Sequence, residues 1–349
     1  MISRMGDGDS SQLERPLVVD VDRTLLRTDI LFETFVQVVF RRPWLIVLVP
    51  IWLLQGKAKL KCELARRSGL SIDTLPANLS LVEWLWGEKK RGRPVVLASA
   101  ADSMLVEQVS RRFSGLFDAV SGSRDGVNLS RQRKLDKIRQ AYGDHFTYVA
   151  DGYHDLVLWR ACRSAVLVGE VDRLRAKLPS DVHVEAVFPT ERAGIRDWLR
   201  AVRLHQWAKN LLIFVPLLLS GNYLVWIENV YSIGAFVSFS LLASAFYLFN
   251  DLMDLNADRA HAKKHNRPLA SGKIPLIEGL VAIPILVGRL TCCCFLGRPQ
   301  FGLPPCGSRL RCVDGAVFAM DQKSRRSRFV FARIFIHDAN HRRHCRGQY

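Results

Sequence analysis

Two acids two residues apart, Asp20 and Asp22, follow a short apolar run in the segment PLVVDVDRT. Side chains at i and i+2 of an extended chain point to the same side, so one carboxylate can attack while the other handles a proton. A nucleophilic aspartate splits phosphoryl transfer into two steps through an acyl phosphate, and a second carboxylate can protonate the leaving oxygen. The pair therefore indicates phosphoryl transfer, although pairs with this spacing also occur without a catalytic role.

Further polar residues follow in an order that strengthens this interpretation. Ser99 ends the run VVLAS, Lys134 lies in SRQRKLDKI, and Asp151 and Asp155 lie in VADGYHD. This ordered set resembles the haloacid dehalogenase-like hydrolase superfamily, whose motifs are a DxDxT loop, a Ser or Thr at the second strand, a Lys and a late acidic pair. The resemblance covers roughly residues 15–190.

The resemblance assigns a role to each of these residues. It implies a nucleophile at Asp20, a general acid/base at Asp22, phosphoryl-binding groups at Ser99 and Lys134, and Mg²⁺ ligands at Asp20 and Asp151 with support from Asp155. Lys137 competes with Lys134 for the lysine role. Arg23 stands where the family commonly has glycine, which puts a bulky cation beside the phosphoryl site. A fold retained without turnover is the alternative.

A second acidic set lies in the segment NDLMDLNADRAHAKKHNRP. On one helix Asp251, Asp254 and Asp258 fall within an arc of about 60°. Three converging carboxylates repel one another unless cations lie between them, and Mg²⁺ bridging carboxylates to a diphosphate meets that need. The cations that could hold the diphosphate oxygens are His261, Lys264 and Arg267. A solvated helix end is the simpler alternative.

The pattern NDxxDxxxDxxHxxKxxRPLASG resembles the UbiA-type intramembrane prenyltransferases, and within them the polyprenyl-phosphate phosphoribosyltransferase-like branch. The resemblance implies an all-helical membrane bundle with a Mg²⁺-dependent diphosphate site and a polyprenyl phosphate or other prenyl substrate. The residues it implies for substrate binding are Asn250, Asp251, Asp254, Asp258, His261, Lys264, Arg267 and Lys209, the last in the opening segment RLHQWAKNLLIFVPLL. The same three aspartates are its implied metal ligands. A second aspartate-rich loop, normal in the family, has no counterpart in this sequence.

Short β-rich runs alternate with helical stretches before residue 190. The runs are PLVVDVD, RPVVLASAAD, FDAVSGS, FTYVADGYHD, AVLVGE and VHVEAVF. Continuous apolar runs suit buried parallel strands, so the sequence predicts an α/β, Rossmann-like domain over residues 15–192. We expect a helical cap at about 30–90 and a disordered tail at 1–14. The apolar stretch 43–56 is too short for a confident membrane span and is interpreted as a cap helix with a membrane-facing side.

Residues 193–288 have the pattern of a partial transmembrane domain. From 210 to 249 there is no Lys or Arg, and Glu228 is the only charge. We predict spans at about 205–225, 229–250 and 274–288. Basic residues on both flanks place both ends of the first hairpin in the cytoplasm. The predicted protein is a multi-pass inner (plasma) membrane protein with a cytoplasmic first domain, and its N-terminus lacks a secretory signal.

The last segment, 289–349, differs in composition from everything before it. It holds 11 Arg, 1 Lys and 3 Asp, and six of the eight Cys. The spacing of these Cys does not suit a metal site, and we expect the segment to be out of frame, so that the transferase half is truncated. Most of the excess positive charge of +17 lies in this segment. A nucleic-acid partner is therefore not expected.

These observations predict a membrane-bound, Mg²⁺-dependent protein of the prenyltransferase type that acts on polyprenyl and diphosphate substrates and has a cytoplasmic phosphatase-like domain. Two alternatives remain open. Either only the phosphatase is active because the transferase half is incomplete, or the chain is a non-catalytic, membrane-anchored remnant. A lipid bilayer is the expected surrounding in each case.

Overall fold

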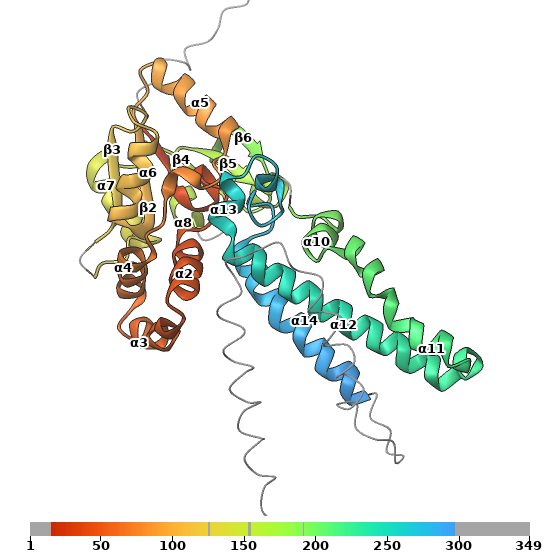
Figure 1. The fold of residues 1–349 in the computed structure, drawn as a ribbon. Helices are drawn as coiled ribbons and strands as arrows, with labels where there is room; N and C mark the ends of the chain where they lie inside the picture. Colours follow the sequence, from red (N-terminus) through yellow and green to blue (C-terminus); the bar gives the residue numbers. More distant parts are fainter. Residues whose placement is uncertain (1–14, 125, 153–154, 191, 297–349) are drawn as a thin grey trace, which may run out of the picture. The chain divides into compact units, whose positions relative to one another are not determined.

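Six parallel strands form the frame of the first domain in a computed structural model that describes residues 15–296 except 125, 153–154 and 191, with side chains up to residue 288. The strands are β1 (Leu17–Val19), β2 (Val95–Asp102), β3 (Ala119–Ser123), β4 (Thr147–Ala150), β5 (Ser164–Gly169) and β6 (His183–Pro189). Their order in the sheet is β3-β2-β1-β4-β5-β6. All six predicted strands are present, and the predicted α/β fold class is confirmed (Figure 1).

Both faces of this sheet are covered, because successive strand residues point to opposite sides. Leu17 and Val19 pack with α5 (Leu79–Lys90) and α6 (Ser103–Arg112) on one face. Val18 packs on the other face with α7 (Gln132–Tyr142), α8 (Leu156–Trp159) and α9 (Val171–Arg175). Burial on two sides explains why the inner strands β1, β2, β4 and β5 are rich in Val, Leu and Ala.

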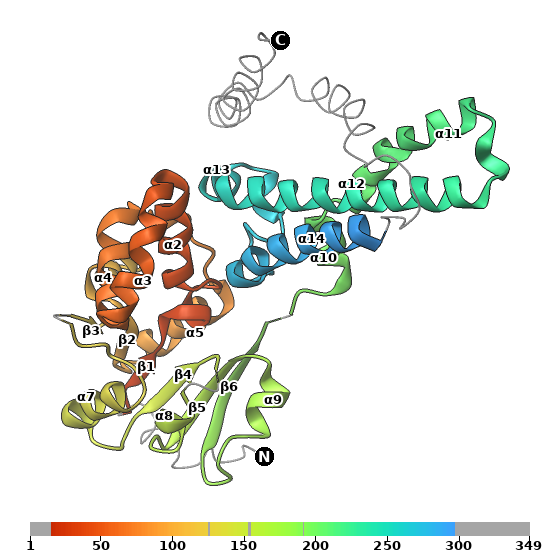
Figure 2. The same ribbon diagram turned by 90° about the horizontal axis from the view of Figure 1, so that it is seen from below.

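The cap lies between β1 and β2 in the sequence and consists of α2 (Ile30–Arg41), a turn of 3-10 helix η2 (Pro43–Val47), α3 (Leu48–Leu54) and α4 (Lys57–Ser68). Asp29 begins α2 as its N-cap, since its carboxylate accepts from the N–H groups of Leu31 and Phe32. The helices α2 and α4 lie side by side, and α3 joins them at the end away from the sheet (Figures 1 and 2). The cap is shorter than the predicted 30–90, because α5 packs on the sheet instead.

Helices α10 (Ile195–Ala201), α11 (Val215–Leu219), α12 (Trp226–Met253), α13 (Leu255–Ala260) and α14 (Leu276–Leu296) follow the sheet. Among the described residues α12 is the one helix long and apolar enough to cross a membrane, and only 28% of its apolar window is buried. An apolar helix left this uncovered favours membrane association over a soluble core helix.

The other two predicted spans are less regular. The stretch predicted as the first span is broken into a 3-10 helix, η5 (Leu204–Phe214), then α11 and a further turn of 3-10 helix, η6 (Asn222–Leu224). The helix α14 continues past Arg289, where the apolar pattern ends, and contains Pro284. The number of membrane crossings therefore stays a prediction. Of the segment predicted to be out of frame, residues 297–349 lie outside the described part of the chain.

The chain divides at residue 293 into two units, and the sheet, the cap and α10 to α13 all belong to the first. Within this unit α2 packs against the end of α12. Val36 of α2 lies in one apolar cluster with Leu248 and Leu252 of α12, and the rings of Phe40 and Phe249 meet edge to face with centroids 5.2 Å apart. The cap is thus packed against the helix that is a candidate membrane span.

Candidate functional site

The first candidate site lies where the strand order of the sheet reverses. Strand β1 pairs with β2 on one side and β4 on the other. In open parallel sheets, ligands bind beyond the carboxyl ends of the strands at such a switch point. Asp20 directly follows β1 and Asp151 directly follows β4, while Ser99 lies within β2. Residues distant in sequence are therefore brought to one edge of the sheet.

Asp20 and Lys134 form the centre of this site. Lys134 Nζ lies 3.0 Å from Asp20 Oδ1 and donates a 2.9 Å hydrogen bond to Tyr148 Oη. Asp20 Oδ1 also accepts from the Val21 N–H at 2.9 Å. Both contacts involve the same oxygen, so Asp20 Oδ2 is the oxygen placed to act as a nucleophile.

The structure also separates the two lysine candidates. Lys134 is 2% exposed, whereas Lys137, one turn further along α7, is exposed. Burial by itself lowers the pKa of Lys134, but the carboxylates of Asp20 and Asp155 outweigh it and hold the pKa above its usual value. Lys134 is therefore a permanently charged group beside the predicted nucleophile, and the geometry favours it over Lys137.

Asp22 has the surroundings of a proton donor. Its Oδ1 accepts from the Ile30 N–H at 2.8 Å, and Ser99 Oγ donates to its Oδ2 at 3.5 Å. Burial, together with the nearby charges of Asp29 and Asp20, raises the pKa of Asp22 well above its usual range. A carboxyl group whose pKa is raised is better able to give a proton to a leaving oxygen.

The late acidic pair lies beside Arg23 and Lys134. Burial raises the pKa of Asp151 to about 7, although the Arg23 guanidinium opposes it, and burial with the Asp20 charge raises the pKa of Asp155 to about 6. Arg23 Nε lies 3.3 Å from Asp151 Oδ2. Arg23 has a φ of 57°, in the left-handed region that favours glycine, which is the residue the family commonly has there.

These residues fit a Mg²⁺ ion. Burial, and after it the negative charge of Asp20, raises the pKa of Asp151, and a divalent cation between the two carboxylates would relieve their repulsion. Mg²⁺ needs only one or two carboxylates together with substrate phosphate oxygens. Among the described residues no three His, Cys, Asp or Glu side chains converge on one point. A Mg²⁺ ion held by Asp20 and Asp151 would therefore take its other ligands from the phosphate group of the substrate.

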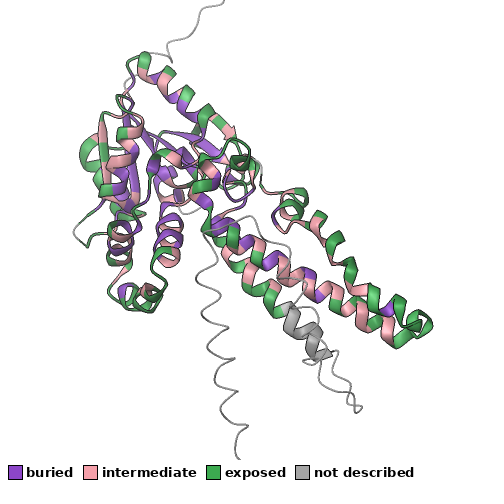
Figure 3. Cartoon of the chain, in the orientation of Figure 1, coloured by how far each residue is buried: buried purple, intermediate pink, exposed green. Residues whose placement is uncertain are grey.

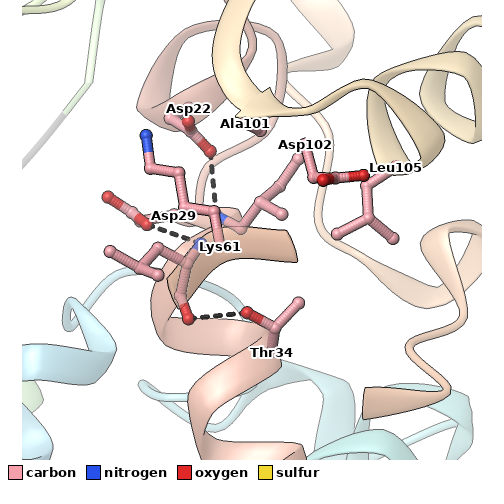
Figure 4. Close-up of a pocket in the computed structure, with 9 residues that line it drawn as sticks. Asp22, Asp29, Thr34, Lys61, Ala101, Asp102 and Leu105 are labelled. Atoms are coloured by element: carbon pink, nitrogen blue, oxygen red, sulfur yellow. Dashed lines mark hydrogen bonds between the residues drawn. The ribbon is translucent and has the colours of Figure 1, made fainter. Parts of the chain in front are cut away.

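A small pocket opens beside Asp22, between the cap and the sheet (Figure 4). Its charged lining includes Asp29 at the start of α2 and Lys61 of α4. Lys61 Nζ donates to the Ala100 carbonyl at 2.6 Å and to Asn128 Oδ1 at 3.2 Å. Burial lowers the pKa of Lys61, although Asp22 and Asp29 oppose this. Neither residue stood out in the sequence, because only the fold brings the cap back to the strand ends.

The second acidic set does not form one helical stripe. Helix α12 ends at Met253 and α13 begins at Leu255, with Asp254 at the junction. The prediction of a continuous helix was wrong, because the break changes the angular relation among the three aspartates. Asp251 and Asp258 are buried, whereas Asp254 is exposed.

Arg267 joins the two buried aspartates. Its Nη1 donates to Asp251 Oδ1 at 3.0 Å and to Asp258 Oδ2. Asp251 also accepts from Arg203 Nη2 at 2.6 Å, and the Arg203 guanidinium lies over the Tyr247 ring. Arg203 was noted in the sequence only as a flanking charge. The two buried aspartates are therefore neutralised by Arg267 and Arg203, and these arginines take the place beside the carboxylates where the sequence predicted Mg²⁺.

The other predicted substrate-binding residues lie on the surface. Lys264 Nζ is 3.8 Å from Asp258 Oδ1 and is half exposed. The remaining three are exposed and are Asn250, His261 and Lys209. The structure thus brings Asp251, Asp258, Arg267 and Lys264 together, and leaves these three outside the cluster.

A buried ion pair joins the two parts of the chain. Arg259, which directly follows Asp258, donates to Glu33 of α2 through Nη1 at 3.0 Å and Nη2 at 2.6 Å. The two side chains are 2% and 0% exposed. Neither residue stood out in the sequence, because a lone Glu on a cap helix and a lone Arg in a basic run carry no sign of each other.

Comparison with known proteins finds sequence relatives of the C-terminal part. No family model matches it. An uncharacterized protein of Sinorhizobium fredii, y4nM, is 33% identical over 302 residues, which is 85% of this chain and 58% of that protein. The decaprenyl-phosphate phosphoribosyltransferase of Mycolicibacterium smegmatis is 41% identical over 99 residues, 26% of this chain and 31% of that protein. The chain therefore spans little more than half the length of the first relative.

Among solved structures, a phosphoserine phosphatase in its apo form covers 54% of this chain and 98% of its own at 16% identity, with a TM-score of 0.36. The fold of the first domain rests on its own strand order and strand-end residues. The C-terminal part of the chain is similar in sequence to the decaprenyl-phosphate phosphoribosyltransferases, as the sequence predicted, and the first domain has the predicted parallel α/β fold. The match to the Sinorhizobium fredii protein covers 302 residues and so extends over both parts.

Proposed function

We propose that the first domain hydrolyses phosphomonoesters. Asp20 Oδ2 attacks phosphorus and forms an acyl phosphate, while Asp22 gives its proton to the departing alkoxide. Asp22 then takes a proton from the water that releases inorganic phosphate. Lys134 and Ser99 hold the phosphoryl oxygens. Mg²⁺, when bound by Asp20 and Asp151, neutralises phosphate charge.

The observation that supports this proposal is the division of roles between the two acids. Asp20 forms an ion pair with the buried Lys134, whereas burial and the neighbouring acids Asp29 and Asp20 raise the pKa of Asp22 well above its usual range. Two carboxylates in such different surroundings suit a nucleophile and an acid.

The test is Mg²⁺-dependent release of phosphate from small phosphomonoesters by the purified full chain. Asp20→Asn should abolish release, whereas Glu107→Gln, which removes only an exposed partner of Arg124, should leave it unchanged. Equal release by the Asp20→Asn variant and the parent chain would contradict the proposed nucleophile.

We further propose that the C-terminal part takes part in Mg²⁺-dependent transfer between a polyprenyl phosphate and a diphosphate donor, with the chain in the inner membrane and the first domain in the cytoplasm. Two observations support it: the similarity to decaprenyl-phosphate phosphoribosyltransferases, and the buried Asp251–Arg267–Asp258 cluster. When a diphosphate and Mg²⁺ enter, Arg267 can pass from the carboxylates to phosphate oxygens, since guanidinium binds both well.

The corresponding test measures transfer of a labelled phosphoribosyl group to polyprenyl phosphate in membranes that contain the full chain. Asp251→Asn and Asp258→Asn should each abolish it. Glu228→Gln, at the start of α12, is the matched control and should retain it. Phosphate release without any transfer would leave the phosphatase as the activity of this chain.

A further inference from the structure

The apolar surface of the cap has no covering element among the described residues. Seven large apolar side chains within Pro43–Leu54 are exposed: Trp44, Ile46, Val47, Leu48, Ile51, Leu53 and Leu54. Trp44 is 67% and Leu54 89% exposed. We call this segment the cap tip; in Figure 3 α3 is coloured almost entirely as exposed. A contiguous apolar surface of this kind marks a binding partner or a membrane.

The fold of the tip is nonetheless fixed from its inner side. Trp52 is buried with Val38 and Leu64, and the guanidinium of Arg67 lies over its ring at 5.0 Å. One tryptophan thus anchors the tip to α2 and α4 while the remaining apolar side chains face outward. The outward apolar face is therefore a stable feature of the folded cap.

Basic residues border the tip at both ends. Arg41 and Arg42 precede it, Lys57 and Lys59 follow it, and all four are exposed. Apolar side chains bordered by Lys and Arg match a lipid bilayer, whose acyl region takes the former and whose anionic head groups attract the latter. This charge pattern favours a bilayer over a purely apolar protein surface.

The contacts between α2 and the end of α12 give the direction in which the tip points. At the start of α2, Glu33 meets Arg259, beyond the end of α12. Two turns later, Phe40 meets Phe249, which lies inside α12. The end of α2 nearer the tip therefore lies alongside the apolar interior of α12, whereas the beginning of α2 lies near the C-terminal end of α12. If α12 enters a bilayer, the cap tip enters the same leaflet.

The same two cap helices line the pocket beside Asp22. Asp29, Leu31 and Thr34 contribute from the beginning of α2, and Lys61 from α4. The twelve residues of α2 span about 18 Å. A tip that lies in the bilayer therefore holds the pocket close to the head-group layer, where a phosphate attached to a lipid would lie.

We propose that the cap tip is inserted into the lipid bilayer and that the phosphatase pocket takes a phosphomonoester carried by a membrane lipid, the product of phosphoribosyl transfer. This inference rests on the proposed function. A phosphoribosyl group brings a phosphomonoester into any product it forms. The phosphatase would break that P–O bond with water, giving inorganic phosphate and a lipid-linked ribosyl group with a free hydroxyl. The two parts of the fused chain would then act in succession.

The experiment uses the full chain in vesicles that contain phosphatidylglycerol. Phosphate release is measured from polyprenyl-phosphoribose 5-phosphate in the bilayer and from soluble ribose 5-phosphate. The tip variant is the double substitution Leu53→Glu and Leu54→Glu. Its matched control is Leu79→Glu, which charges a side chain that is 65% exposed on α5, outside the tip. In parallel, a photo-crosslinking amino acid is placed at position 54 or at position 79.

We expect the tip variant to lose about tenfold or more of its rate on the lipid substrate, because charged side chains are costly in a bilayer. Its rate on ribose 5-phosphate should stay within about twofold, and the control should match the parent chain on both substrates. Position 54 should crosslink to lipid and position 79 should not.

Three outcomes would overturn the inference: equal loss on both substrates, no preference for the lipid substrate in the parent chain, or crosslinks from position 54 to a second protein chain only. The proposed phosphatase function fails separately. In that case neither substrate releases phosphate in an Asp20-dependent manner, while lipid crosslinking at position 54 still decides whether the tip is inserted.

Discussion

Replacing Glu33 by Gln should release α13, which carries Asp258 and Arg259, from the first domain. Glu33 accepts three hydrogen bonds, two from Arg259 and one from Thr28 Oγ1. Gln retains an acceptor for Thr28 but loses the negative charge, so the Arg259 guanidinium, only 2% exposed, is left buried without its counter-ion. Removing one partner of such a pair costs about 3–5 kcal/mol.

Each 1.4 kcal/mol is a factor of ten in an equilibrium constant. This cost therefore corresponds to an increase of roughly 10²- to 10³·⁵-fold in the population in which residues 255–270 are detached from the first domain. Hydrogen exchange of the amides at 255–270, in the full chain in detergent or nanodiscs, measures that population directly. Arg259 is the less suitable residue to change by itself, since its Nε also donates to the Ala270 carbonyl and holds its own loop.

A double variant, Glu33→Gln with Arg259→Met, removes both charges. Its amides at 255–270 should exchange more slowly than the sum of the two single effects predicts. Asp144→Asn provides the control. It breaks the exposed pair with Arg139, whose side chains are 58% and 44% exposed, and exposed pairs contribute about 1 kcal/mol or less. A change of less than about threefold at 255–270 in Glu33→Gln, or simple additivity in the double variant, would refute the view that this pair fastens the two parts together.

Three further predictions concern the first domain. Lys134→Met should lower the rate of phosphate release by about 10²–10³-fold, since it removes a charge beside the reacting phosphoryl group. Lys137→Met, at an exposed position, should change that rate by less than about threefold. Equal effects of the two variants in a kinetic assay would contradict the assignment of the lysine. Arg23→Gly should raise the free energy of unfolding by about 1 kcal/mol, because glycine adopts the left-handed backbone without strain. The same variant should need less Mg²⁺ for half-maximal phosphate release, because Asp151 loses a competing cation. A higher Mg²⁺ requirement would contradict this reasoning. Burial raises the pKa of Glu185, but hydrogen bonds and charge from Arg93 outweigh it, so the pKa lies below its usual value. The stability that Glu185 contributes is therefore complete at neutral pH and is lost as the pH falls through the acid range, and Glu185→Gln should flatten that part of a melting-temperature profile against pH.

Local patterns were sufficient to predict much of the first domain. Mostly apolar runs marked the four inner strands, because a strand buried on both faces must be apolar on both, and shorter or mixed runs marked the edge strands β3 and β6. The acids at strand ends were also visible, since in an open parallel sheet the carboxyl ends of neighbouring strands lie at one edge. The positions of Asp20 and Asp151 at one edge of the sheet follow from these rules.

The second acidic set shows where local patterns failed. A helical periodicity assumes that the helix continues, and nothing in the segment NDLMDLNADRA indicates that it breaks at Asp254. Around the break, Asp251 accepts hydrogen bonds from Arg267 and Arg203, and Arg259 forms an ion pair with Glu33. Such long-range pairs leave no periodic signal.

The sequence by itself therefore determined the strands, the order of the catalytic candidates and the kinship of the C-terminal part, because each depends on residues close together in the chain or on a short motif. Only the tertiary structure decided that Lys134 rather than Lys137 meets Asp20, that Lys61 lines the pocket, and that Glu33 is joined to Arg259 across 226 positions. The physical reason is that burial and charge pairing depend on which distant segments meet, and that is fixed by the packing of the whole fold.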